Sequence, residues 1–161
     1  MGLALCSLLI ACAPKPENVE HPTPTPTPTV WPTGKSVTYQ LKAPSTVSIS
    51  GTGQFPIKSG SVSIIGGANK LTDLDVTAKS PKAAPDGEVG MTILINPAGT
   101  ALAGTLLVGH EEFHAVQSGH FAITQTSSAI RIVVDSTNPL TVNGEVGTRN
   151  ETLTMTLIGT K

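Results

Sequence analysis

Apolar and polar residues alternate in many short stretches of this chain. The clearest stretch is ETLTMTLIG at residues 151–159, in which Leu153, Met155 and Leu157 alternate with threonines. Alternation with a period of two is typical of a β-strand that has one apolar face and one wet face. Glycine, proline and asparagine separate such stretches, so the pattern predicts an all-β antiparallel sandwich or barrel. The other alternating segments are STVSISG (45–51), GSVSIIGG (60–67), KLTDLDVTA (70–78), GMTILIN (90–96), HFAITQT (120–126) and AIRIVVD (129–135).

One segment departs from this alternation. Residues 96–119, NPAGTALAGTLLVGHEEFHAVQSG, are rich in alanine and leucine, which favour helices. Internal glycines each cost about 1 kcal/mol relative to alanine in a helix, and they argue against a long one. We therefore expect a short helical segment near residues 100–117 that bridges two strands at the rim of the domain.

Composition and charge narrow the fold and the partners further. Threonine, serine, glycine and valine are plentiful and only 13% of the residues are charged, which again favours an all-β protein. The formal net charge is −1, and no cluster of lysine or arginine occurs along the sequence. Nucleic-acid binding needs concentrated positive charge to meet the phosphates, so we expect no nucleic-acid partner.

The N-terminus has the features of an export signal. Residues 1–12, MGLALCSLLIAC, form an apolar run that is too short to span a bilayer as a helix. Residues 9–12 resemble a bacterial lipobox, in which Cys12 becomes the acylated first residue of a lipoprotein; an ordinary cleaved signal is the alternative. Ala13 stands in place of the aspartate that retains enteric lipoproteins at the inner membrane. We therefore expect an exported lipoprotein on the periplasmic side of a bacterial membrane, with the outer membrane favoured.

A stretch of alternating proline and threonine follows the signal. Residues 13–34, APKPENVEHPTPTPTPTVWPTG, cannot form a helix or the interior of a sheet, because proline lacks a backbone donor. Because the stretch directly follows the predicted lipid anchor, we interpret it as a stiff tether. The alternative is an interdomain linker. The folded domain is then expected over residues 35–161. It contains no disulfide, because Cys6 lies in the signal and Cys12 is acylated.

Three histidines raise an enzymatic alternative. His110-Glu111-x-x-His114 matches the zinc motif in which two histidines share one helical face and the glutamate polarises a bound water. His120 follows at a distance suited to a third ligand. However, Gln117 occupies the position where related zinc proteases turn the chain with a glycine, and the flanking segments are strand-like. Two interpretations therefore remain. These residues form the metal site of a zinc hydrolase, or they belong to a polar segment at the rim of the domain that binds no metal.

The same region, together with segments before and after it, resembles the YceI-like family. Leu107, Phe113, Phe121 and Ile123 follow the order of that family's signature, in which a leucine opens a short polar segment, an aromatic ends it and an alternating strand follows. Downstream, LTVNGEVGTRNETLTMTLIG is similar to the family's last two strands. Upstream, APSTVSISGTGQ and GSVSIIGGANKLTDLDVTAKS are similar to its opening strands. The resemblance spans residues 39–159.

The resemblance implies a fold and a function. Members of the family are lipocalin-like antiparallel β-barrels of about eight strands. They bind long apolar lipids such as polyisoprenoids inside the barrel, without catalysis. The expected partners are therefore an apolar lipid and, through the N-terminal anchor, a membrane. No cofactor is expected, and the sequence identifies no protein partner. A filled barrel that serves a structural role without a ligand is the alternative.

The inward apolar residues of the predicted strands are the candidate lining of such a barrel. Aromatic residues make up only 3% of the chain, so an interior built from them would leave room for a slender ligand. Core packing explains any one of these residues equally well, and the prediction therefore concerns the set. The candidates are Val47, Ile49, Ile64, Leu74, Val76, Phe113, Phe121, Ile123, Ile132, Leu153, Met155 and Leu157, with Phe113 expected near the mouth.

Overall fold

The regular secondary structure of the described chain is almost entirely β-strand. The computed structural model describes residues 34–117, 119–144 and 150–161, and within them the helical structure is one short 3-10 turn, η1 (Ala68–Lys70). The strands are β1 (Ser36–Leu41), β2 (Ser45–Ile49), β3 (Gly53–Ile57), β4 (Ser59–Gly66), β5 (Thr72–Lys79), β6 (Glu88–Ile95), β7 (Ala101–Val108), β8 (Glu111–Gln117), β9 (Ala122–Gln125), β10 (Ala129–Val134), β11 (Leu140–Gly144) and β12 (Asn150–Thr160). The all-β antiparallel fold predicted from the sequence is confirmed, and the seven alternating segments form β2, β4, β5, β6, β9, β10 and β12.

Eight of the strands form a hydrogen-bonded ring. Neighbouring strands follow the order β1-β4-β5-β6-β7-β8-β11-β12, and β12 pairs again with β1. This last pairing is short, because it consists of Gln40 opposite Thr160 and Leu41 opposite Gly159. The remaining four strands are two hairpins that extend the ring on either side of β12: β2 with β3, and β10 with β9.

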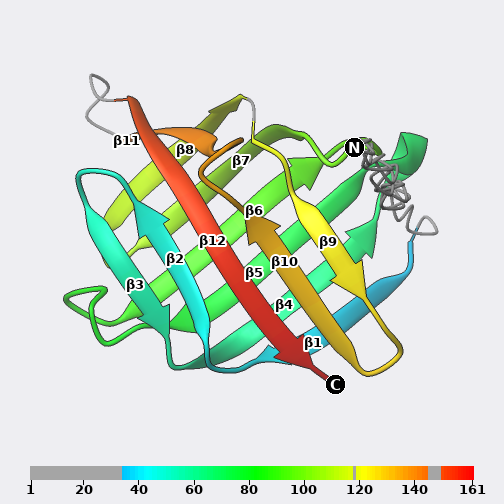
Figure 1. The fold of residues 1–161 in the computed structure, drawn as a ribbon, viewed down its shortest axis with the longest axis horizontal. Coiled ribbons are helices and arrows are strands. Elements are labelled where there is room, and N and C mark those ends of the chain that lie inside the picture. The colour runs from blue at the N-terminus through cyan, green and yellow to red at the C-terminus, as the bar shows by residue number, and fades with distance from the viewer. Residues whose placement is uncertain (1–33, 118, 145–149) are drawn as a thin grey trace, which may run out of the picture.

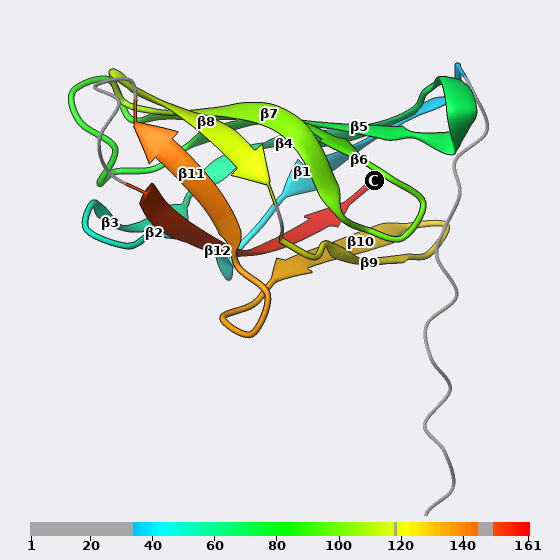
Figure 2. The ribbon, with the colours of Figure 1, turned by 90° about the horizontal axis from the view of Figure 1, so that it is seen from above.

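The ring is flattened into two layers. Figure 1 shows β3, β2, β12, β10 and β9 side by side in front, and we call these strands the front layer. Behind them lie β4, β5, β6, β7 and β8, the back layer. Seen from above in Figure 2, β11 and β1 cross from one layer to the other. The apolar side of each layer therefore faces the other, and the buried hydrophobic cluster fills the space between them.

The C-terminal strand β12 holds this arrangement together. Its eleven residues pair with β11 and β10 along one edge and with β2 and β1 along the other. Near its end, β1 and β10 approach so closely that only glycine fits. A Cβ atom at Gly159 would lie 2.8 Å from Cβ of Tyr39 and 3.1 Å from Cγ2 of Ile130.

The helical segment predicted near residues 100–117 is wrong. The chain there forms β7 and β8, an antiparallel pair joined at Gly109, whose φ of +61° favours glycine. Leu106 and Phe113 lie opposite each other and are both buried. Pairing with β6 and burial in the core outweigh the helix preference of alanine and leucine.

In the part of the chain that is described, no helix is long and apolar enough to cross a membrane.

Candidate ligand-binding interior

The predicted lining residues lie together between the two layers. All of them belong to the buried cluster except Ile123, which is partly buried and packs against it. The back layer contributes Ile64 from β4, Leu74 and Val76 from β5 and Phe113 from β8, whereas the front layer contributes Val47, Ile49, Ile132, Leu153, Met155 and Leu157, with Ile123 from β9 and Phe121 just before it. The strand register places Leu157 opposite Ile132 and Leu153 opposite Ile49, so the front set forms a continuous apolar face.

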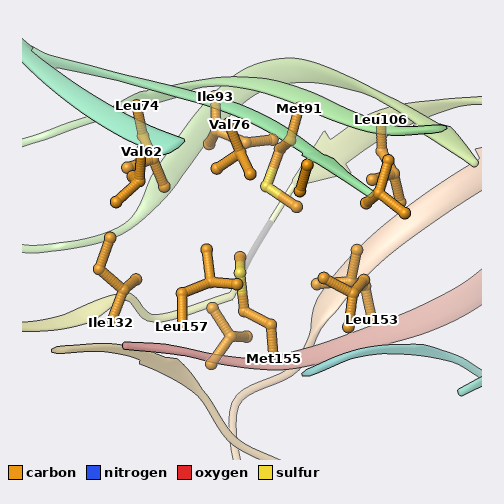
Figure 3. Packing of buried hydrophobic residues seen from close by; sticks show 14 of the residues in the cluster. Val62, Leu74, Val76, Met91, Ile93, Leu106, Ile132, Leu153, Met155 and Leu157 are labelled. Atoms are coloured by element: carbon orange, nitrogen blue, oxygen red, sulfur yellow. The ribbon is translucent and has the colours of Figure 1, made fainter. Parts of the chain in front are cut away.

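Two methionines occupy the middle of this interior. Figure 3 shows Met91 of β6 and Met155 of β12 pointing toward each other from opposite layers. Both side chains are buried. Methionine is unbranched and polarisable, so it adapts its shape to irregular apolar neighbours more readily than leucine or valine does. This pair is the most adaptable part of the core.

The sequence prediction missed several residues of the interior. Met91, Ile93 and Leu106 line it from the back layer, as Figure 3 shows. Met91 and Ile93 alternate with polar or outward residues in GMTILIN, so the sequence already indicated that they face the interior. Leu106 lay hidden in the segment that was predicted to be helical. Tyr39 is fully buried on β1, where Val37, Tyr39 and Leu41 alternate over a stretch too short and polar to stand out.

The interior is closed around most of its lining. Leu74, Leu153 and Leu157 have exposed fractions of 0%, as do Val47, Ile64 and Ile132. These six side chains are therefore shielded from solvent on all sides. The groups that meet between the layers are hydrocarbon and thioether, which offer apolar contact and no acid–base chemistry. A ligand that enters the centre has to displace side chains.

Several polar groups at the boundary of the core are bonded within the fold, whereas the buried Oδ1 of Asn143 has no hydrogen-bond partner among the described residues. The hydroxyl of Tyr39 accepts a hydrogen bond from Nε2 of Gln125, which ties the β9 margin of the front layer to β1. The hydroxyl of Thr52 donates to the buried carboxylate of Glu151 over 2.9 Å. Ser45 donates to the backbone oxygen of Lys42 over 2.6 Å and fixes the bend between β1 and β2. These groups shape the rim of the interior.

The histidines of the zinc alternative lie outside this interior. His110 is in the turn before β8, with Nε2 3.7 Å from Oδ2 of Asp86, and its side chain is 73% exposed. His114 is exposed on β8, with Nε2 4.0 Å from Oε1 of Glu112. His120 is exposed and forms an isolated bridge with Thr100.

The strand also changes the spacing on which the zinc motif depends. On a helix, residues four apart lie on one face at about 6 Å. An extended strand advances roughly 3.3 Å per residue, so residues four apart along a strand lie about 13 Å apart, and from Glu111 onward this motif is part of strand β8. The helical premise of the zinc hydrolase is therefore wrong. Among the residues whose positions are described, no three His, Cys, Asp or Glu side chains gather as metal ligands would.

Comparison with protein families, curated proteins and solved structures finds no match for this chain. The fold and the interior therefore define only a class: a barrel-like all-β domain with an apolar interior. The predicted acylation site Cys12 and all of the predicted tether (13–34) except Gly34 lie outside the described residues.

Proposed function

We propose that this domain binds a slender apolar lipid, isoprenoid-like in shape, between its two layers and without catalysis. The anchor at Cys12 would hold it on the periplasmic side of a bacterial membrane, as the lipobox-like sequence suggests. The observation that carries the proposal is the apolar interior, in which Met91 and Met155 face each other from opposite layers. The sequence resemblance to the YceI-like family supports it as well. Members of that family are barrels of about eight strands, and eight strands of this chain form a ring.

Binding would work by rearrangement of the core. Each Å² of apolar surface removed from water contributes about 25 cal/mol, so a long hydrocarbon gains considerable free energy in such an interior. The cost is the displacement of side chains, which is smallest for methionine because its three side-chain torsions adapt easily. We therefore expect the ligand to pass between Met91 and Met155.

A second candidate function also has an observation in its favour. The exposed fraction of 0% at Leu74, Leu153 and Leu157 is what a permanently filled core would show. In that case the chain is a structural domain at the membrane surface, and its contacts with other molecules lie on its outer faces. The two candidates differ in whether the interior ever opens.

Lipid analysis of the purified full-length protein separates the two candidates. We expect organic extracts and native mass spectrometry to show a bound apolar molecule, and a fluorescent polyisoprenoid alcohol to bind in a saturable manner. If no lipid co-purifies and the labelled polyisoprenoid does not bind, lipid binding is excluded and the structural candidate stands.

A matched pair of variants tests the position of the ligand. Replacing Met91 and Met155 by leucine conserves volume, so the fold should persist, but it removes the adaptable side chains. A loss of about 1 kcal/mol would weaken polyisoprenoid binding by roughly fivefold. Thr154→Val changes the neighbouring residue on the outer side of β12 and should leave affinity unchanged. Equal affinities in both variants would place the ligand elsewhere.

A further inference from the structure

Leu102 is the most exposed large hydrophobic side chain among the described residues, with an exposed fraction of 46%. It owes this position to an irregularity in the pairing of β6 with β7. Leu94 pairs with Ala103 but Ile95 pairs with Ala101, so Leu102 is an extra residue in β7. Such a β-bulge redirects side chains, and here two successive residues, Leu102 and Ala103, are both exposed.

Further apolar side chains lie beside this bulge on the outer side of the back layer. The strand register aligns Ile65 of β4, Asp73 of β5, Leu94 of β6 and Ala103 of β7 in one row. Ile65 and Leu94 are partly exposed there. Neighbouring strands are about 4.8 Å apart, so the row extends over roughly 14 Å.

The chain enters the domain at the same end. The backbone N–H of Gly34 donates to the oxygen of Gly66, where β4 ends, and Gly66 in turn donates to Lys35. The described chain therefore begins at Gly34, beside the end of β4, which leads directly into η1. Two exposed cations, Lys35 and Lys70 of η1, lie at this end.

We propose that this end of the back layer rests on the surface of the lipid bilayer to which the chain is anchored. The tether-end surface consists of Ile65, Leu94, Leu102, Ala103, Lys35 and Lys70. The inference rests on the anchored location given under the proposed function, but not on ligand binding in the interior.

The chemistry of the surface fits a lipid headgroup region with anionic lipids. Leu102 and Leu94 reach the boundary between headgroups and acyl chains, where apolar side chains of peripheral proteins lie. Lys35 and Lys70 meet the phosphates of anionic lipids at the end where the described chain begins, whereas the carboxylates of this face, Asp73 and Asp75, lie on β5. A tether that meets the fold at Gly34 would keep this end of the domain near the bilayer and so favour this weak contact.

Fluorescence quenching on vesicles tests the orientation. The full-length lipidated protein is placed on vesicles of phosphatidylcholine and phosphatidylglycerol that contain brominated lipid, with an environment-sensitive dye on Leu102→Cys. The matched control carries the dye on Thr154→Cys, which lies on the outer side of the front layer. We expect a blue shift and quenching at residue 102 and neither at residue 154. Equal quenching at both positions overturns the proposal.

Two additional measurements keep the outcome decisive. Lys70→Glu, introduced into the protein labelled at residue 102, should reduce quenching on anionic vesicles and leave it unchanged on purely zwitterionic ones; no difference overturns the role of the cations. Mass spectrometry of the same sample reports the acyl chains on Cys12. Their absence overturns both this proposal and the anchored location, whereas acylation with equal quenching overturns this proposal alone.

Discussion

The back layer and the front layer are assembled in different ways. In the back layer, β4 to β8 pair in the order in which they follow along the chain. The front layer collects segments far apart in sequence, since Met155 of β12 pairs with Val47 of β2 and Leu157 pairs with Ile132 of β10. The back layer is therefore built from local hairpins, whereas the front layer depends on β12 closing long loops.

The two layers also differ on their outer sides, although their inner sides are alike. The back layer exposes a mixture of carboxylates and apolar side chains, such as Asp73, Leu94 and Leu102. The front layer presents hydroxyl groups beside one another on β2 and β12, next to those of the crossing strand β11, and its β10 exposes the cation Arg131. Both outer surfaces carry hydroxyl groups, and they differ chiefly in the carboxylates that the back layer exposes, such as Asp73 and Asp75. The hydroxyl groups on β2, β12 and β11 are those of Thr46, Ser48, Thr141, Thr152, Thr154 and Thr156.

Truncation of one leucine in each layer should give the largest effects. Leu74 in the back layer and Leu157 in the front layer both have exposed fractions of 0%. Leu→Ala at either position should lower the free energy of unfolding by about 2–5 kcal/mol. Urea denaturation measures this loss, and Thr154→Ala on the outer side should stay within roughly 0.5 kcal/mol of the parent.

Kinetics of the same two variants test the assembly difference. Local hairpins form before long loops close, so Leu74→Ala should mainly slow folding and Leu157→Ala should mainly speed unfolding. Stopped-flow measurements across urea concentrations separate the two rates. If Leu157→Ala slows folding as much as Leu74→Ala does, the layers form together and the comparison fails.

The next largest loss of stability is expected at Gly159, where β12 lies close to β1 and β10. Gly159→Ala places a Cβ atom 2.8 Å from Cβ of Tyr39, which cannot move without shifting β1. Such overpacking should cost about 1–3 kcal/mol in urea denaturation. Thr156→Ala, at a partly exposed position of the same strand, is the control. An unchanged free energy of unfolding in Gly159→Ala would show that the ring does not depend on close contact between β1 and β12 here.

The local part of the fold could be predicted from the sequence, and the non-local part could not. Alternation identified β12 and placed Leu153, Met155 and Leu157 on its inner side, because a strand's two faces follow from residue spacing alone. Nothing in those eleven residues indicates that β12 pairs with four other strands, because this depends on contacts across the whole chain.

The errors of the sequence prediction have the same origin. The β7–β8 pair was predicted as helical because alanine and leucine favour helices locally, whereas pairing with β6 decides the structure. The exposure of Leu102 could not be predicted, because it results from a bulge in the pairing of two strands. The interior was predicted as a set of residues, but its closure around Leu74 and Leu157 depends on how the two layers pack, which residue spacing does not determine.

A smaller effect should come from the link between the margin of the front layer and the ring. Tyr39→Phe removes the hydroxyl that accepts the hydrogen bond from Gln125 and should cost about 0.5–1.5 kcal/mol. Thr38→Val is the matched control, because it removes the exposed hydrogen bond to Ser63 that joins β1 and β4. Amide hydrogen exchange should accelerate in β9 in Tyr39→Phe only. Unchanged exchange in β9 would mean that pairing with β10 alone holds that margin.

The smallest effect is expected from pH, at the loop that carries the chain from β10 in the front layer to β11. The pKa of Asp135 is held below its ordinary value of 3.8, chiefly by the hydrogen bond from the Thr137 hydroxyl at 2.5 Å. The backbone N–H groups of Thr137 and Asn138 add to the shift.

A carboxylate with a depressed folded-state pKa stabilises the fold above its unfolded pKa, and this contribution is lost as the pH falls through the folded pKa. Because Asp135 is fully exposed, the loss of stability in acid should be slight. Thr137→Val should raise the pKa of Asp135 toward 3.8, as measured by NMR titration of its carboxyl carbon. Thr126→Val alters the β9–β10 turn, where the Thr126 hydroxyl accepts from the N–H of Ala129, and should leave that titration unchanged. An Asp135 titration that does not respond to Thr137→Val would show that the backbone donors alone organise the loop.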